Sequence, residues 1–282
     1  MRRTQRGATH PRALTAIAAL AASLALGACS GSPARSGASA EPAGMQLFLL
    51  AGQSNMAGRG VVEARDREPN ARVLMLDRSL AWRPATDPVH FDKPIAGVGP
   101  GRAFALALVA RDSTLRIGLV PAAVGGSPIS SWEPGALDPA TRTHPYDDAL
   151  VRARAAQRDG RLRAILWHQG ESDATPELSM IYAPKLRALI ARFRADLAEP
   201  DLPFLIGQLG RFDARPWTDA TRRVDSVHRA IAASTPHAAF VSSDGLRDKS
   251  DTLHFDAASA RLLGERYAAA YVALTRASAT RK

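Results

Sequence analysis

The amino-acid sequence predicts a three-layer α/β/α domain built around a parallel β-sheet. Three observations lead to this prediction. Short apolar segments of strand length recur along the chain, helical patterns separate them, and polar or glycine-rich segments directly follow several of the apolar runs. The chain has 282 residues, of which 46% are hydrophobic and 23% are charged. That composition is typical of a globular domain and argues against disorder or a fibrous repeat.

Six apolar runs have the length of β-strands. Their hydrophobic residues are continuous rather than alternating, which is typical of strands that are buried on both faces of a parallel sheet. The runs lie at 45–51, 72–76, 115–120, 162–168, 203–209 and 238–242.

Hydrophobic residues recur at helical spacing between these runs. Three groups show the pattern: Leu186, Leu189, Ile190, Phe193 and Leu197; Val224, Val227 and Ile231; and Leu263, Tyr267, Ala270 and Leu274. Asp256 stands just before the last group, in a position where aspartate is favoured as a helix N-cap. Because strand and helix patterns alternate from residue 45 onward, we expect one domain with right-handed crossovers.

The first 44 residues are interpreted as sorting and linking segments. Residues 1–28 combine a basic, acid-free start with a short apolar run, which is typical of a secretory signal and too short to span a bilayer. The run ends in Leu26-Gly27-Ala28-Cys29, which resembles the lipobox of bacterial lipoproteins, where the cysteine receives a lipid. An ordinary signal peptide with an incidental Cys29 is the alternative.

These features predict four segments. They are a signal peptide at 1–28, a Ser/Gly/Ala/Pro-rich flexible tether at 29–44 with a lipidated Cys29, one domain at 45–277, and a C-terminal tail at 278–282. The expected location is the bacterial cell envelope, with the lipid on Cys29 anchoring the protein to the membrane so that it faces the periplasm or the cell surface.

The formal charge of +10 is a weak guide to function. Four arginines and no acidic residue fall within residues 1–28, so the charge drops to +6 (10 − 4) if that segment is removed. The remaining arginines are dispersed along the chain, which together with export argues against a nucleic-acid partner. A single cysteine excludes an internal disulfide and a zinc site made of several cysteines.

Polar segments follow three of the predicted strands. They lie at 52–58, 121–127 and 168–173, and a fourth polar segment at 251–254 precedes the last helix. In an open parallel sheet, ligands bind beyond the carboxyl ends of the strands. We therefore expect the four segments to form the functional site.

Three residues in these segments have the chemistry of a catalytic triad. Ser54 follows the first strand, and Asp251 and His254 are three residues apart, so the carboxylate can reach one imidazole nitrogen while the other faces a nucleophile. Each has a plainer interpretation as well. Ser54 is equally suited to be a helix N-cap, and Asp251 and His254 to be a surface residue and a helix-capping residue.

Several further residues are candidates for the site. The glycines at 125 and 126 can bring backbone N–H groups close to a ligand, and Gln169 carries an amide donor at a strand end. A tight turn and a polar loop are the plainer interpretations. His168, Glu171 and Asp173 lack a recognisable metal-ligand spacing, so we expect no metal site, and Glu171 and Asp173 instead support loops through hydrogen bonds.

Taken together, the segments resemble the SGNH/GDSL hydrolases, in particular the branch of sialate O-acetylesterases and acetylxylan esterases. The resemblance covers about residues 45–275, and four motifs carry it: GQSNMAG at 52–58, AVGGS at 123–127, WHQGESD at 167–173 and DTLHFD at 251–256. It implies a flavodoxin-like fold with a central parallel sheet of about five strands.

The resemblance also implies roles for individual residues. Ser54 is the nucleophile, His254 the general base and Asp251 its orienting partner. The oxyanion hole consists of the Ser54 N–H, the N–H of Gly125 or Gly126, and the Gln169 side chain. The supporting loop residues are Gln53, Asn55, Glu171 and Asp173.

The expected function is that of a serine esterase that removes O-acetyl groups from carbohydrates of the sialate or xylan type, without a cofactor. Two alternatives remain open from the sequence. One is an esterase of the same fold acting on peptidoglycan O-acetyl groups, acyl lipids or thioesters. The other is a lipoprotein that binds glycans without turnover.

Overall fold

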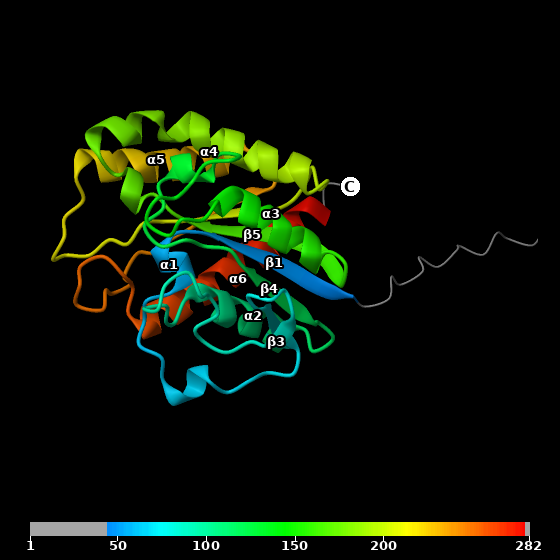
Figure 1. The fold of residues 1–282 in the computed structure, drawn as a ribbon. Helices are drawn as coiled ribbons and strands as arrows, with labels where there is room; N and C mark the ends of the chain where they lie inside the picture. Colours follow the sequence, from blue (N-terminus) through cyan, green and yellow to red (C-terminus); the bar gives the residue numbers. More distant parts are fainter. Residues whose placement is uncertain (1–43, 280–282) are drawn as a thin grey trace, which may run out of the picture. The chain divides into compact units, whose positions relative to one another are not determined.

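The structure, a computed structural model, describes residues 44–279. Its centre is a seven-stranded sheet in the order β3-β2-β4-β1-β5-β6-β7 (Figure 1). Six strands are parallel, and β3 alone pairs antiparallel, with β2. The strands are β1 Met45–Gly52, β2 Val73–Leu76, β3 Trp82–Pro84, β4 Ile117–Pro121, β5 Gly160–His168, β6 Phe204–Gly207 and β7 Ala238–Val241.

Helices cover both faces of the sheet and complete the predicted three layers. α3, α4 and α5 lie over one face, and α2 and α6 lie over the other (Figure 1). The α-helices are α1 Ser54–Ala57, α2 Pro100–Arg111, α3 Pro145–Ala156, α4 Pro176–Asp196, α5 Asp219–Ser234 and α6 Ala257–Ala279. Short 3₁₀ helices lie at Ala64–Asp66, Ile129–Trp132 and Glu171–Asp173. The predicted fold class is confirmed.

The sheet is larger than the expected five or so strands. All six apolar runs form parallel strands, and the seventh strand, β3, was not predicted. β3 has three residues, ends in a proline and is largely exposed, so no apolar run marks it in the sequence. Its place at the edge of the sheet suits that proline, which cannot donate a ladder hydrogen bond.

The continuous apolar runs are explained by β1, which lies at the centre of the sheet. Successive side chains of a strand point to opposite faces. Leu47, Leu49 and Ala51 pack into the core beneath α3 and α4, whereas Phe48 and Leu50 pack into the core beneath α2 and α6. Both faces therefore require hydrophobic residues, and no alternation is left in the sequence.

Three helices, α4, α5 and α6, begin at residues whose side chains cap the first turn. The Thr175 and Thr218 hydroxyls accept hydrogen bonds from the backbone three residues on, at the starts of α4 and α5. Asp256 accepts one from the Ser259 N–H at 2.6 Å, which confirms its predicted role as the N-cap of α6. This cap also fixes the end of the loop that carries His254.

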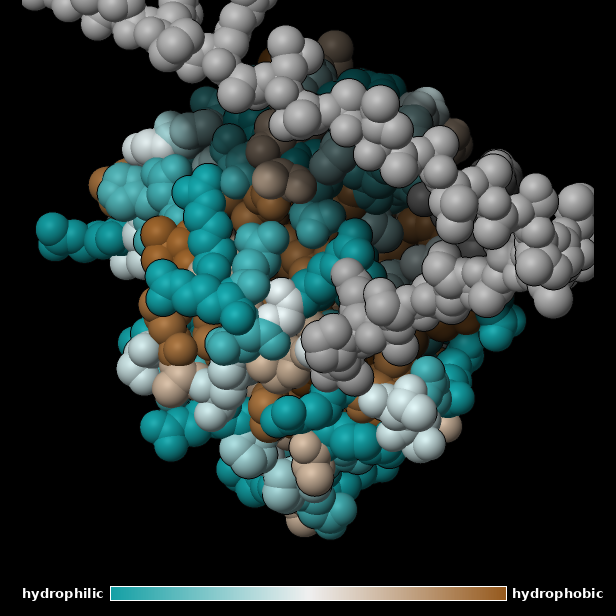
Figure 2. Space-filling model, turned by 90° about the vertical axis from the view of Figure 1, so that its right-hand side faces the viewer, coloured by the Kyte–Doolittle hydropathy of each residue, from teal (hydrophilic) through white to brown (hydrophobic). Residues whose placement is uncertain are grey.

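One face of the domain carries both hydrophilic and hydrophobic residues. Figure 2 views the end at which β1 begins, and hydrophilic residues cover much of that face with hydrophobic residues showing between them. Within residues 44–279, no helix is long and apolar enough to cross a membrane.

Candidate active site

The four polar segments meet at the carboxyl end of the sheet, where β1 leads into α1 (Figure 1). Gly52, the last residue of β1, pairs with His168 at the end of β5. Gly52 has a φ of +121°, and a Cβ atom there would lie 2.1 Å from the His168 carbonyl oxygen. Only glycine fits this close approach, which turns the chain out of the sheet one residue before Gln53.

Ser54 is the first residue of α1 and is 6% exposed. The turn before it is fixed by a hydrogen bond from the Gln53 N–H to the His168 carbonyl, 2.8 Å. At the other end of the short helix, Gly58 N–H donates to the Ser54 carbonyl at 2.8 Å. The serine is therefore held by the backbone on both sides.

Ser54, His254 and Asp251 form a continuous hydrogen-bonded chain. His254 Nε2 lies 3.0 Å from Ser54 Oγ, and His254 Nδ1 lies 2.8 Å from Asp251 Oδ2. Burial raises the pKa of Asp251, but hydrogen bonds from the backbone and side chain of His254 outweigh it, so the pKa is well below its usual range. Asp251 is thus a carboxylate that orients the imidazole toward the serine.

The loop that carries Asp251 and His254 is a tight turn closed by its own backbone. Asp248 and Phe255 form an antiparallel bridge at its base, and Lys249 N–H donates to the His254 carbonyl at 2.9 Å. At its tip, Asp251 Oδ1 accepts the N–H of His254 at 2.8 Å, as aspartate does in Asx turns. Thr252 between them has a φ of +60°, a conformation that is unusual for a residue with a side chain.

Asn55 joins this loop to the serine turn. Its Nδ2 donates to Glu171 Oε1 at 2.7 Å and to the Leu253 carbonyl at 3.1 Å, and its Oδ1 accepts the Phe255 N–H at 3.1 Å. The two loop residues that Asn55 binds flank His254 directly. Asn55 therefore sets the position of the imidazole relative to the adjacent Ser54.

Gln53, Glu171 and Asp173 bind the neighbouring loops through hydrogen bonds. Gln53 Oε1 accepts the N–H groups of Gly170 and Ser172, each at 3.3 Å. Glu171 is the partner of Asn55 described above. Asp173 Oδ2 accepts the Ile129 N–H at 2.9 Å, and burial raises the pKa of this carboxyl group.

Two of the predicted oxyanion donors have other partners in the structure. Gly125 N–H donates to Asp92 Oδ2 at 2.8 Å. Gln169 is fully buried, and its Nε2 donates both to the Ser127 carbonyl at 3.1 Å and to the Asp173 carboxylate. An amide nitrogen has two hydrogens, so Gln169 has no donor left for a substrate. The geometry assigns Gly125 and Gln169 to the framework rather than to the oxyanion hole.

Ser54 and Gly126 retain free backbone donors. Among the described residues, neither N–H group has a hydrogen-bond acceptor. Gly126 is exposed and has a φ of +84°. Val124 N–H donates to the Gly52 carbonyl at 2.9 Å, which extends the pairing of β1 and β4 and keeps this loop beside the serine turn. These two N–H groups are the candidates for stabilising an oxyanion.

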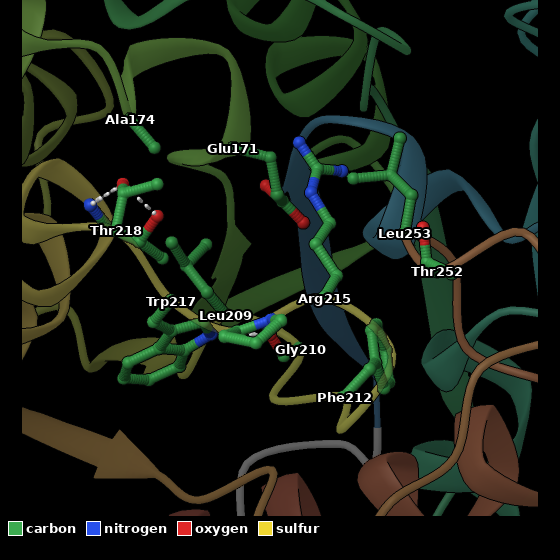
Figure 3. Close-up of a pocket in the computed structure, with 12 residues that line it drawn as sticks. Glu171, Ala174, Leu209, Gly210, Phe212, Arg215, Trp217, Thr218, Thr252 and Leu253 are labelled. Carbon is green, nitrogen blue, oxygen red and sulfur yellow. Dashed lines mark hydrogen bonds between the residues drawn. The ribbon is translucent and has the colours of Figure 1, made fainter.

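A pocket of about 100 Å³ lies next to the His254 loop. Thr252 and Leu253 form one side of it, Glu171 another, and Phe212 and Trp217 line it further out (Figure 3). The exposed Arg215 extends between Glu171 and Leu253 in Figure 3. The pocket thus combines aromatic rings, a cation and hydroxyl groups beside the loop that carries His254.

Two further residues near the site, Arg59 and Asp92, were not predicted from the sequence. Arg59 directly follows the GQSNMAG motif, and Asp92 lies 33 residues later, outside every motif segment. They form a buried ion pair of 2.7 Å behind the Gly125 loop. The position of Arg59 beside the motif was a usable signal, whereas nothing in the sequence pairs it with Asp92.

His168 is a structural residue. It is fully buried, and burial lowers the pKa of its imidazole. Its Nε2 lies 2.9 Å from the Gln208 carbonyl, which requires a proton on that nitrogen. No group of three or more His, Cys, Asp or Glu side chains placed to hold a metal ion occurs within residues 44–279. Cys29 and the predicted signal and tether lie outside the described residues.

A family model and a plant relative each match most of the chain. The model of the family described as "Carbohydrate esterase, sialic acid-specific acetylesterase" matches residues 44–273. A probable carbohydrate esterase of Arabidopsis thaliana is 34% identical over 249 residues, which cover 80% of this chain and 90% of that protein.

Solved structures show the same similarity. An X-ray structure of an Arabidopsis thaliana protein superimposes with a TM-score of 0.72 at 32% identity, covering 82% of this chain and 98% of that one. The crystal structure of NanS superimposes with a TM-score of 0.71 at 19% identity, covering 83% of this chain and 98% of that one. At 19% identity, the similarity to NanS shows the fold alone.

Proposed function

The chain belongs to the sialic acid-specific acetylesterase family of SGNH-type carbohydrate esterases, and we propose that it removes O-acetyl groups from carbohydrates by means of a Ser54–His254–Asp251 triad. Membership makes it a carboxylic ester hydrolase that acts on carbohydrates. The observation that supports the triad is the hydrogen-bonded chain from Ser54 Oγ to His254 Nε2, 3.0 Å, and from His254 Nδ1 to Asp251 Oδ2, 2.8 Å.

The proposed reaction proceeds through an acyl-enzyme. Ser54 Oγ attacks the acetyl carbonyl carbon while its proton passes to His254 Nε2. The carbonyl oxygen becomes an oxyanion, which accepts hydrogen bonds from the N–H groups of Ser54 and Gly126. His254 then gives its proton to the departing sugar oxygen, and the ester bond to the sugar breaks.

Water completes the cycle. His254 takes a proton from a water molecule, whose oxygen attacks the acetyl-serine carbonyl, and the return of that proton to Ser54 Oγ releases acetate. Asp251 keeps the proton of the neutral imidazole on Nδ1, so that Nε2 is free to accept in both halves of the reaction. No step calls for a cofactor.

The pocket beside the His254 loop supports a sugar as the leaving group. Trp217 is half-buried and offers an aromatic face, and threonine hydroxyls and the Arg215 guanidinium supply hydrogen-bond donors. Sugars present both apolar C–H faces and hydroxyl groups, and sites that bind them combine aromatic rings with a few polar groups.

The test compares the purified wild-type protein with Ser54→Ala and with Ser130→Ala, an exposed serine that serves as the control. Acetate release is measured from O-acetylated sialic acid, acetylated xylan and O-acetylated peptidoglycan, and acetate and octanoate esters of 4-nitrophenol test acyl length. We expect Ser54→Ala to lower kcat by about 10³- to 10⁶-fold and Ser130→Ala to leave it unchanged.

The same set of proteins separates the alternatives. Hydrolysis that survives Ser54→Ala would refute the triad. Faster turnover of octanoate than acetate esters would indicate a lipid substrate. A wild-type protein that binds acetylated glycans but is not labelled at Ser54 by a fluorophosphonate would be a binding protein without turnover.

Export and lipidation are a separate proposal that rests on the sequence. We propose that cleavage after Ala28 exposes Cys29, the one cysteine of the chain, for lipidation, which places the esterase at the cell envelope. Labelled fatty acid should be incorporated into the wild-type protein and not into Cys29→Ser. Equal labelling of both proteins, or of neither, would refute it.

A further inference from the structure

We propose that Asp92 and Arg59 are positioning residues that hold the oxyanion loop in register with the nucleophile. The oxyanion loop is residues 124–126. This inference rests on the proposed function, because it assigns a task to residues that reach the reacting atoms only through Ser54 and Gly126.

Asp92 fixes one side of the oxyanion loop. Its Oδ2 accepts the Gly125 N–H at 2.8 Å and an Arg59 Nη2 hydrogen at 2.7 Å. Both side chains of the ion pair are 2% exposed, so water does not compete for these bonds. A backbone N–H bound to a buried, paired carboxylate is held much more firmly than one that faces solvent.

Arg59 connects the same carboxylate to the serine turn. Its Nη1 donates to the Gly58 carbonyl at 2.7 Å, and Gly58 N–H in turn donates to the Ser54 carbonyl at 2.8 Å. One guanidinium therefore binds the end of α1 with one nitrogen and Asp92 with the other. Through it, the two free donors at Ser54 and Gly126 belong to a single hydrogen-bonded unit.

The glycine at 125 is explained by this ion pair. A Cβ atom on Gly125 would lie 2.2 Å from Arg59 Nη2 and 2.7 Å from Asp92 Oδ2, so any larger residue would displace the pair. By contrast, a Cβ atom on Gly126 would meet only Lys93 Nζ, at 3.8 Å. Gly125 provides close packing of the loop against the pair, and Gly126 is the residue open to a ligand.

Charge balance gives Arg59 a second task. The Asp92 carboxylate binds Gly125, the residue that precedes the proposed oxyanion donor Gly126. Its negative charge would oppose the negative charge that develops on the substrate oxygen. The Arg59 guanidinium offsets this charge at 2.7 Å. The pair can therefore fix the loop through Asp92 without an uncompensated negative charge beside the reaction.

The experiment compares Asp92→Ala with Asp92→Asn. Asparagine keeps an oxygen that accepts the Gly125 N–H, whereas alanine removes it. We expect Asp92→Ala to lower kcat for 4-nitrophenyl acetate by about 10- to 100-fold with little change in KM, because misplacement of an oxyanion donor affects the transition state more than substrate binding. Asp92→Asn should recover kcat to within about threefold of the wild type.

A matched control is the second buried aspartate–arginine pair, Asp66–Arg261. Asp66 is 1% exposed and lies 2.6 Å from Arg261 Nη2, and it has no bond to the serine turn or the oxyanion loop. Asp66→Ala should lower the melting temperature and leave kcat unchanged. If Asp92→Ala does not fold, Arg59→Lys replaces it, since an ammonium cannot bind Gly58 and Asp92 in the same fork geometry, and kcat should fall about tenfold.

The outcomes are distinct. A folded Asp92→Ala with wild-type kcat, a loss confined to KM, or an equal loss in Asp92→Asn would each overturn the positioning role. If Arg59→Lys carries the test, wild-type kcat overturns it as well. A wild-type protein without esterase activity, or one that remains active as Ser54→Ala, would instead refute the proposed function and this inference with it.

Discussion

Replacing Asn55 with aspartate tests how the His254 loop is held. The substitution preserves the shape of the side chain and the oxygen that accepts the Phe255 N–H. It replaces the Nδ2 donor with an oxygen that faces Glu171 Oε1 at 2.7 Å and the Leu253 carbonyl at 3.1 Å. Two carboxylates and a carbonyl oxygen would then meet in a site where Asn55 is 3% exposed.

The cost follows from Coulomb's law. With an effective dielectric constant of about 20, two unit charges repel by about 6 kcal/mol at 2.7 Å and by about 4 kcal/mol if the loop relaxes to 4 Å. That is a large share of the ~5–15 kcal/mol by which a typical domain is stable. When the pH is lowered, one carboxyl group takes up a proton and can donate it to the other, which restores the bond.

Urea unfolding at about pH 5 and about pH 8 measures this effect. The free energy of unfolding of Asn55→Asp should be several kcal/mol below that of the wild type at the higher pH and should approach it at the lower pH. Asn55→Ala loses the two Nδ2 hydrogen bonds, and the one from Phe255 as well, without adding a charge, so its deficit should be similar at both pH values. A deficit of Asn55→Asp that does not depend on pH, or none at all, would refute the assigned contacts.

Three further predictions concern the triad, the turn and a buried acid. Asp251→Asn should lower kcat by about 10⁴-fold, because an amide donor at His254 Nδ1 forces the imidazole proton onto Nε2, the nitrogen that faces Ser54. A loss of less than about tenfold in steady-state kinetics would contradict this. Gly52→Ala should lower the free energy of unfolding by at least about 2 kcal/mol. The φ of Gly52 is +121°, and the added Cβ atom would lie 2.1 Å from the His168 carbonyl oxygen. Urea denaturation measures this loss. Burial raises the pKa of Asp87 to about 7 from 3.8, so the folded state favours the protonated acid and loses stability as the pH rises through about 7. Asp87→Asn removes that titration. The free energy of unfolding of this variant, relative to that of the wild type, should therefore rise between about pH 5 and about pH 8. Absence of this trend would count against a buried acid at position 87.

Most of the fold could be predicted from the sequence because the parallel strands are buried on both faces. Such strands must be hydrophobic throughout, so the run at 45–51 marks β1 directly, and the run at 162–168 marks β5. The edge strand β3 has no such requirement and left no pattern. The meeting of Ser54, Asp251 and His254 was also predictable, because their segments follow a strand or precede a helix whose place in the layers is known.

The roles of the individual polar residues around the site could not be predicted in the same way. Gly125 and Gly126 are adjacent glycines, yet the Gly125 N–H is bound to Asp92 and the Gly126 N–H has no acceptor among the described residues. The difference depends on a carboxylate 33 residues away that no local pattern connects to this loop. The partners of the Gln169 amide, Ser127 and Asp173, are likewise not evident from the local sequence.

The proposed nucleophile Ser54 and its proposed base His254 are 200 residues apart in the chain, at opposite ends of the domain's sequence. Ser54 is therefore synthesised well before the segment that carries His254. Asn55 binds both neighbours of His254 and so joins these two distant segments. Under the proposed mechanism, a chain that ends before residue 254 lacks the base for Ser54 and should not hydrolyse esters.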